Sequence, residues 1–384
     1  MGKDSWILEA VKGSKFGLKL SAIKKFLFER SKIDDLTKCM LCPNMCRFAC
    51  PISIVGGRET TSPAGKARIA YLLREGYIEE TNENVLPLYY CLSCDICKNW
   101  CVFGFSVGDL IRPIRKELYL KEIYPQELVS IVENLKQRGI PYDVPSIEEK
   151  EGDILYLWGC YTRKYTPEIG ETTIKFFEHM GYKIKIINNE PCCGYLAYEL
   201  GDEKLFLKIA NKNAQLLNKM QVKAIITSCP ICAYTYRKLY PKYKIKIKHD
   251  VYHVSEFIKM NIDKLNFHET NIKVTVHDSP KLTIGLDQPD IIREILMSIP
   301  GVEVMLPMRY GKNTFPCGNE GGLLDFVDKD LSIEITSERL RELKEEADIT
   351  ITTSPRCKHA FSSLGANALD LVEFLFKVME EDAD

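Results

Sequence analysis

Eight of the 15 cysteines in this chain fall into two short runs, and this clustering limits the fold more than any other feature of the sequence. The runs are Cys39-x2-Cys42-x3-Cys46-x3-Cys50-Pro51 and Cys91-x2-Cys94-x2-Cys97-x3-Cys101. No stretch is apolar enough to span a membrane, and the first 13 residues lack a signal-peptide pattern, so we expect a cytoplasmic protein. Because that compartment disfavours structural disulfides, such runs indicate metal ligation.

The second run resembles the bacterial ferredoxin motif, and the first differs from it by one extra residue. In such motifs three thiolates on a tight loop hold one cubane, and the fourth cysteine reaches the neighbouring cluster. We therefore expect one [4Fe-4S] cluster on Cys39, Cys42, Cys46 and Cys101, and another on Cys91, Cys94, Cys97 and Cys50. A pair of four-cysteine structural zinc sites is the alternative.

The remaining pattern predicts an α+β protein with a helical ferredoxin-like domain followed by two α/β units. Residues 62–74 begin with Ser-Pro and carry apolar residues at helical spacing, which predicts a helix between the cysteine runs. Residues 139–152 are typical of a linker. We expect an N-terminal amphipathic segment at 1–34, the two-cluster domain at 35–145, and cysteine-rich units at 150–268 and 269–384.

Strand and helix patterns alternate through both of these units. In the first unit, strands are predicted at 154–158, 183–187 and 224–227, with helices at 168–180 and 204–220. The order recurs in the second unit, with strands at 272–276, 302–306 and 349–352 and helices at 290–299 and 332–346. This alternation predicts a parallel sheet in each unit and an internal repeat of roughly 110 residues.

Five cysteines of the first unit follow its predicted strands: Cys160, Cys192, Cys193, Cys229 and Cys232. Parallel sheets place ligand sites at the carboxyl ends of their strands, so these thiols are expected to converge on one crevice. Five convergent thiols exceed the four of a closed zinc site, although zinc stays open as the alternative.

This cysteine pattern resembles the CCG cysteine-rich domain of heterodisulfide reductase catalytic subunits. Over about residues 35–375 the layout is also similar to the iron-sulfur subunits of glycolate oxidase and anaerobic glycerol-3-phosphate dehydrogenase. The resemblance implies that the five cysteines of the first unit form the catalytic site and bind a non-cubane [4Fe-4S] cluster that engages a substrate sulfur.

The second unit keeps the spacing of the first but loses three of the five ligands. Pro280 stands at the position of Cys160, Pro316-Cys317-Gly318 replaces Cys192-Cys193-Gly194, and Ser354-Pro355-Arg356-Cys357 replaces Cys229-Pro230-Ile231-Cys232. Two interpretations remain open. Cys317 and Cys357 form a sparse metal site with His277, or they are buried free cysteines inherited from a duplicated ancestor.

The resemblance implies an iron-sulfur oxidoreductase subunit of a heterodisulfide-reductase-like complex, which passes electrons to a thiol or disulfide substrate or carrier. The alternative is a relay subunit of a flavin-linked glycolate, lactate or glycerol-3-phosphate dehydrogenase that delivers electrons to quinone. The chain has no flavin fingerprint, so a flavoprotein or a membrane quinone or cytochrome subunit is the expected partner. A zinc-stabilised scaffold is a third class.

The net charge of the chain and the residue pattern of its N-terminal segment indicate which kinds of partner to expect. The 52 basic residues nearly balance the 53 acidic ones, so no basic field favours nucleic acid. Residues 6–28 combine apolar side chains with five lysines. This segment suits peripheral attachment at the inner face of the membrane, docking on a partner, or packing against the chain's own core.

Overall fold

The chain folds, from residue 34 onwards, into a helical module followed by two α/β units. The computed structural model describes residues 34–380, so the segment expected at 6–28 lies outside the described residues. No strand occurs between residues 34 and 149. The helices of the module are α3 (Asp35–Leu41), α4 (Pro51–Gly56), α5 (Pro63–Arg74), α6 (Asn82–Tyr89), α7 (Ile96–Asn99), α8 (Val107–Leu120) and α9 (Val129–Arg138).

Each unit contains a four-stranded sheet in which all neighbouring strands are parallel. The first sheet has the order β2-β1-β3-β4 and the second has the order β6-β5-β7-β8. Their strands are β1 (Ile154–Leu157), β2 (Ile184–Lys185), β3 (Ala224–Thr227), β4 (Val251–His253), β5 (Ile272–Val276), β6 (Val302–Met305), β7 (Ile349–Thr352) and β8 (Asn367–Asp370). The predicted fold class, α+β with tandem α/β units, is confirmed.

Helices cover both sheets. In the first unit they include α10 (Cys160–Tyr165), α11 (Pro167–His179), α12 (Tyr195–Leu200), α13 (Glu203–Lys219), α14 (Pro230–Tyr234) and α16 (Val254–Met260). In the second unit they include α17 (Ile291–Leu296), α18 (Leu324–Val327), α19 (Lys329–Lys344), α20 (Pro355–Ser363) and α21 (Leu371–Glu380). The predicted helices at 168–180, 204–220, 290–299 and 332–346 correspond to α11, α13, α17 and α19.

The structure differs from the sequence prediction at the edges of both sheets. It adds a fourth strand to each, β4 and β8, which are short and too weakly patterned to stand out as strands. It also shortens the strand predicted at 183–187 to Ile184 and Lys185. The central strands are buried on both faces and match their predicted positions closely, because continuous apolar runs mark them in the sequence.

Helix α5 connects the two cysteine runs, as the sequence predicts. The Ser62 hydroxyl accepts a hydrogen bond from the backbone N–H of Gly65 at 3.0 Å, and Pro63 occupies the first turn, where its missing N–H costs nothing. Ala67, Ala70 and Leu73 bury one face of the helix. This face packs into the hydrophobic core that the module shares with the first unit.

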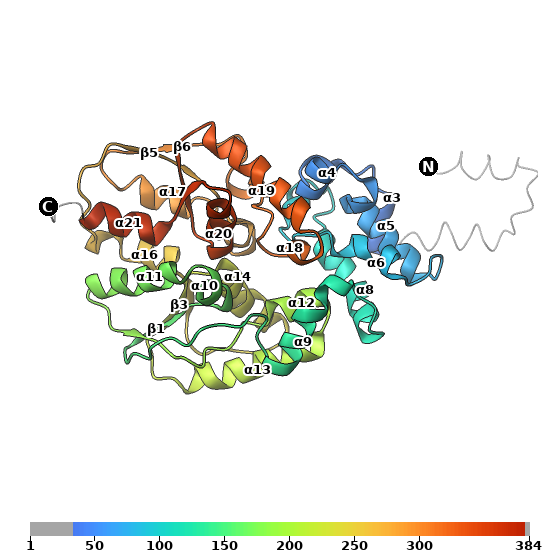
Figure 1. Ribbon diagram of the computed structural model, residues 1–384, viewed down its shortest axis with the longest axis horizontal. Coiled ribbons are helices and arrows are strands. Elements are labelled where there is room, and N and C mark those ends of the chain that lie inside the picture. The colour runs from blue at the N-terminus through green and yellow to red at the C-terminus, as the bar shows by residue number, and fades with distance from the viewer. Residues whose placement is uncertain (1–33, 381–384) are drawn as a thin grey trace, which may run out of the picture.

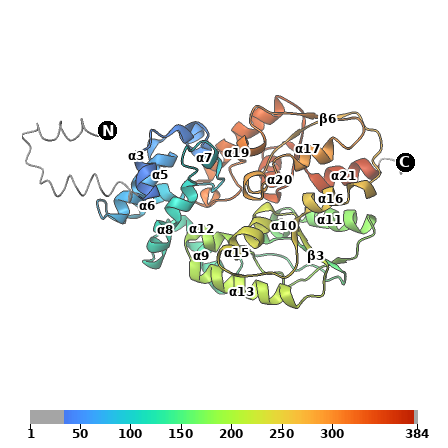
Figure 2. The ribbon, with the colours of Figure 1, turned by 180° about the vertical axis from the view of Figure 1, so that it is seen from behind.

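The two units stack on one another, and the helical module caps one end of the stack (Figure 1; the view from behind in Figure 2 agrees). Helix α4 of the module contacts α19 of the second unit, while α8 contacts α12 of the first. Between the units, α11 packs on α21 and α10 packs on α20. The cysteine loops of the module therefore lie beside both α/β units.

Asp370, at the end of β8, is expected to make stability depend on pH. Burial raises the pKa of its carboxyl to about 8, so the folded chain binds a proton that the unfolded chain releases above about pH 4. Raising the pH therefore stabilises the unfolded state relative to the folded state. The free energy of unfolding falls by up to about 1.4 kcal/mol per pH unit between about pH 4 and 8. Urea denaturation at several pH values should show this decrease in the wild type and not in Asp370→Asn. The same pH dependence of the unfolding free energy in both proteins would contradict this prediction.

Within residues 34–380, no helix combines the length and the apolar character needed to cross a bilayer.

Candidate metal centres

Four cysteines of the module gather around the N-terminal loop. Cys39 lies on α3, Cys42 follows that helix, Cys46 lies on a short turn, and Cys101 comes from beyond α7. Burial, together with the charges of Cys46, Cys101 and Cys42, raises the pKa of the Cys39 thiol to about 12. The structure thus brings together the four residues that the sequence assigns to one cluster, including the one contributed by the second run.

The other four cysteines of the module line a single cavity: Cys50, Cys91, Cys94 and Cys97. Cys50 caps the start of α4, and its thiol lies close enough to Cys94 of the second run to raise the pKa of the Cys94 thiol. Burial raises the pKa of the Cys94 and Cys97 thiols well above the ordinary value. Ionising these crowded thiols is costly unless a cation compensates them, which is the situation expected of a metal centre.

Asn44 accommodates the extra residue of the first run. Its backbone has φ of 65°, a left-handed conformation that asparagine tolerates better than most residues. Its side-chain amide donates to the Ser62 hydroxyl at 3.0 Å and accepts from the Ala64 N–H at 3.3 Å. The longer spacer is therefore fastened to the start of α5, and Cys46 still faces Cys39 and Cys101.

In the first α/β unit, one pocket is lined by all five predicted cysteines: Cys160, Cys192, Cys193, Cys229 and Cys232. Cys160 follows β1, the vicinal pair precedes α12, and the last two flank Pro230 after β3. The thiols interact directly, since hydrogen bonds from Cys192 and Cys232 lower the pKa of Cys193. The predicted convergence at the strand ends is therefore present in the structure.

The vicinal pair is held by its backbone. The amide of Asn213 donates to the Cys192 carbonyl at 2.8 Å, and the Tyr240 hydroxyl donates to the Cys193 carbonyl at 3.0 Å. Gly194 follows with φ of 87°, and a Cβ there would lie 3.2 Å from Ile209. The left-handed backbone at this position favours glycine, and the Ile209 side chain would have to shift to admit a Cβ.

Glu190 supports the pocket and escapes sequence analysis. Its carboxylate accepts hydrogen bonds from the backbone N–H groups of Trp158 at 2.9 Å and Gly159 at 2.7 Å, which shapes the turn before Cys160. Burial raises the pKa of this carboxyl to about 7. The only local signal is its position two residues before the vicinal cysteines, and a loop glutamate is normally solvated.

Lys281 and Tyr195 link the second ferredoxin loop to the five-cysteine pocket. The Lys281 ammonium donates to the Ser93 carbonyl at 2.6 Å, between Cys91 and Cys94. It also lies 5.4 Å from the ring centre of Tyr195, which lines the pocket. These contacts form one chain. It runs from a cysteine loop of the module, through a lysine of the second unit, to the five-cysteine pocket of the first unit.

The glycine-rich loop 318–322 belongs to the same junction. A Cβ on Gly322 would lie 1.8 Å from the carbonyl oxygen of Cys91, and one on Gly321 would lie 2.2 Å from that of Leu92. The second unit therefore approaches the ferredoxin loop through bare backbone. In the structure this loop is a run of bends that packs against the second cysteine loop.

A crevice between the two units lies next to the five-cysteine pocket. Its lining includes Tyr142, Tyr165 and His359, and Tyr161 lines both the crevice and the pocket. The buried guanidinium of Arg356 sits 4.3 Å from the Tyr161 ring centre and donates to the Tyr142 hydroxyl at 2.6 Å. These side chains separate the thiols from the crevice, and their convergence from two units left no signal in the sequence.

Comparison with known families decides what the two units are. The model of the CCG cysteine-rich domain matches residues 154–237 and again residues 274–362. This chain is a protein with two CCG cysteine-rich domains. The recognition made from the cysteine pattern is therefore confirmed, including the repeat.

Several curated relatives of this CCG-domain protein have names that describe redox proteins. A subunit of the CoM/CoB fumarate reductase of Methanothermobacter marburgensis is 26% identical over 86% of this chain and 68% of its own length. The probable iron-sulfur-binding oxidoreductase FadF of Bacillus subtilis is 26% identical over 72% and 43%. The EtfAB:quinone oxidoreductase of Syntrophomonas wolfei is 24% identical over 64% and 37%. The chain thus falls among iron-sulfur redox proteins.

A solved structure shares the fold. A hypothetical protein from Helicobacter pylori aligns with a TM-score of 0.60 over 94% of this chain and 76% of its own, at 12% identity. At that identity the likeness concerns the arrangement of the elements alone.

Proposed function

We propose that this CCG-domain protein is the electron-transfer subunit of a heterodisulfide-reductase-like complex and acts on a disulfide or thiol. The observation that carries the proposal is the contact chain from Ser93 through Lys281 to Tyr195, because it joins the second ferredoxin loop to the five-cysteine pocket. The similarity to a subunit of the Methanothermobacter CoM/CoB fumarate reductase supports a place in a redox complex.

The donor sets suit iron-sulfur clusters. Two cubane [4Fe-4S] clusters would be held by Cys39, Cys42, Cys46 and Cys101 and by Cys91, Cys94, Cys97 and Cys50, and a further cluster, non-cubane by resemblance, by Cys160, Cys192, Cys193, Cys229 and Cys232. When bound, such clusters supply one-electron transfer. The buried thiols, crowded in two cavities, provide only sulfur ligands, which are the ligands that iron-sulfur clusters use. The alternative is that the five cysteines of the first unit bind zinc, and metal analysis would distinguish the two.

The chain's own residues would control access to the thiols. Arg356 and Tyr142 hold Tyr161 between the inter-unit crevice and the pocket, so a substrate reaches the cysteines past this aromatic wall. The positive charge of Arg356 is balanced by the Asp325 carboxylate at 3.3 Å, which also holds the guanidinium in place. Arg356 therefore positions the aromatic side chains and does not react itself. We expect the crevice to take the substrate's sulfur end first.

The test is an EPR titration of the anaerobically purified chain with a heterodisulfide or oxidised thiol carrier, without partner subunits. If the first-unit cluster meets sulfur directly, the spectrum of that cluster changes while the cubane signals stay constant. The same titration of Tyr161→Trp, which narrows the entrance, should require at least about tenfold more disulfide. A spectrum indifferent to every thiol and disulfide would overturn the catalytic role.

The second candidate is a relay subunit of a flavin-linked dehydrogenase that passes electrons toward quinone. It is favoured by the relative named EtfAB:quinone oxidoreductase and by the absence of a flavin fingerprint from the sequence. Co-purification with a flavoprotein, together with an indifferent EPR titration, would select it. Peripheral membrane attachment through residues 6–28 fits either candidate.

A further inference from the structure

The second CCG domain does not fit the cluster that its family model implies. Only Cys317 and Cys357 remain at positions equivalent to Cys193 and Cys232 of the first unit. The other three positions carry Pro280, Pro316 and Ser354, of which the prolines have no side-chain donor. Two thiolates cannot supply the five-sulfur set of the first unit, so this site requires a separate chemical account.

Compared with the first unit, the second unit has lost three thiols but has gained two other side chains that can bind a metal. The pairing of Val274 with Ile349 in the second sheet is equivalent to that of Ile154 with Ala224 in the first. Counting three residues onward places His277 at the position of Leu157.

A count from the retained cysteine places an acidic residue beside the site. Counting three residues onward from Cys317 and Cys193 places Glu320 at the position of Leu196. Leu196 lines the thiol pocket of the first unit, and Leu157 is buried there, so both positions are apolar. A histidine and a glutamate in their places are unexpected for packing alone.

The gained and retained side chains meet in the second unit. One ring nitrogen of His277 and the Sγ atoms of Cys317 and Cys357 all lie within 4.8 Å of one another. The two Sγ atoms are 2.8 Å apart, and the Cys357 thiol faces Oε2 of Glu320 at 3.5 Å. All four residues are buried, with at most 1% of their surface exposed. Oε1 of Glu320 accepts a hydrogen bond from the Ser279 hydroxyl at 2.6 Å, so its Oε2 is the oxygen that faces the thiols. Four side chains of the types that bind zinc are thus gathered in one buried place.

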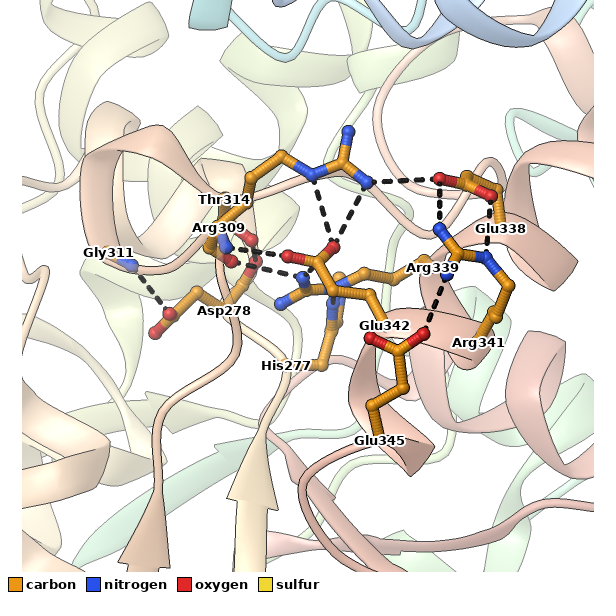
Figure 3. Close-up of polar contacts among 10 residues, drawn as sticks. All are labelled: His277, Asp278, Arg309, Gly311, Thr314, Glu338, Arg339, Arg341, Glu342 and Glu345. Carbon is orange, nitrogen blue, oxygen red and sulfur yellow. Dashed lines mark hydrogen bonds and ion pairs between the residues drawn. The ribbon is translucent and has the colours of Figure 1, made fainter.

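A network around His277 orients its ring (Figure 3). The Arg339 Nε–H donates to Nδ1 at 3.2 Å, and Arg339 is held in turn by Glu342 at 2.7 Å and by the Arg309 carbonyl at 3.0 Å. The other ring nitrogen, Nε2, is buried and lacks a hydrogen-bond partner among the described residues. Because Nδ1 accepts this hydrogen bond, the ring proton lies on Nε2 in the metal-free chain, and Nε2 becomes available to a metal once that proton moves.

We propose that His277, Cys317, Cys357 and Glu320 bind one zinc ion at the degenerate cluster site. Two thiolates, one imidazole nitrogen and one carboxylate oxygen make the four-coordinate donor set that zinc prefers. Binding releases the two thiol protons and moves the ring proton of His277 to Nδ1, so the contact to Arg339 must lengthen. It also separates the sulfurs to about 3.8 Å, the distance set by tetrahedral bonds of about 2.3 Å.

The experiment compares metal content in the two units of the intact chain, purified anaerobically. We expect about one zinc per chain beside the iron, and a loss of zinc of at least about tenfold in Cys317→Ala and Cys357→Ala with iron unchanged. Cys193→Ala serves as the matched control, because it alters the equivalent position of the first unit. It should lower iron and leave zinc in place.

His277→Leu tests the site with the residue that the first unit carries at this position. It should also lower zinc while thermal unfolding shows that the chain stays folded. Zinc-edge X-ray absorption of the unchanged protein should show two sulfurs at about 2.3 Å and lighter atoms at about 2.0 Å. Loss of iron with Cys317→Ala would overturn the proposal, and so would zinc that survives in the double cysteine variant.

Discussion

An anaerobic preparation of Cys94→Ala is expected to hold about eight irons per chain where the unchanged chain holds about twelve, because one cubane of three clusters is lost. Cys94 lines the cavity that also contains Cys50, Cys91 and Cys97, and alanine offers no ligand in its place. The measurement is iron per chain by plasma mass spectrometry, with EPR of the reduced protein to identify which signal disappears.

Cys193→Ala provides the matched comparison for this loss. It should remove a similar amount of iron but a different EPR signal, because the five-cysteine pocket is separate from the module's cavities. If the two variants abolish the same signal, the two sites are not independent and the ligand assignment fails. Zinc in stoichiometric amount with no iron in the unchanged chain would contradict the redox function as a whole.

The cysteine spacing predicts much of the site because cluster ligands lie close together along the chain. In the proposed assignment three ligands of each cubane would come from one short loop, so the spacing alone predicts which thiols face inward. The repeat of strand and helix places Cys160, Cys193 and Cys229 at equivalent strand ends, and the pocket in the structure brings them together. Local patterns therefore determine the positions of the sulfur atoms.

The polar side chains around the cysteine sites could not be predicted, because each reaches its place through contacts between segments that are distant in the sequence. Lys281 looks like a surface residue in the sequence, yet its side chain is buried against Ser93, 188 residues earlier in the chain. Arg356 likewise contacts Tyr142 from a distant part of the chain. A charged residue is usually solvated, and only the stacking of three separate parts of the chain buries these.

Glu199 is the buried charge on which the junction between the module and the first unit depends. Its carboxylate accepts hydrogen bonds from Arg112 and Arg115, both at 3.0 Å, and from the Ser93 hydroxyl at 2.6 Å. Burial alone would raise the pKa of Glu199, but the charges of Arg112 and Arg115 hold it down to about 2. The carboxylate is therefore ionised throughout the physiological range.

Glu199→Leu is expected to lower the free energy of unfolding by about 3–5 kcal/mol, because it leaves the fully buried Arg115 guanidinium without its counter-charge and leaves Arg112 with only the exposed Asp109. Glu203→Gln is the matched control: it breaks a pair with Lys116 across the same junction, between α8 and α13, but the side chains of this pair are 35–43% exposed. Such a pair contributes about 1 kcal/mol or less. Urea denaturation of both variants measures the difference, and limited proteolysis at residues 139–152 reports whether the module detaches. Equal effects of the two substitutions would mean that the junction is held by apolar packing, and that the buried carboxylate is dispensable for placing the Ser93 loop beside the five-cysteine pocket.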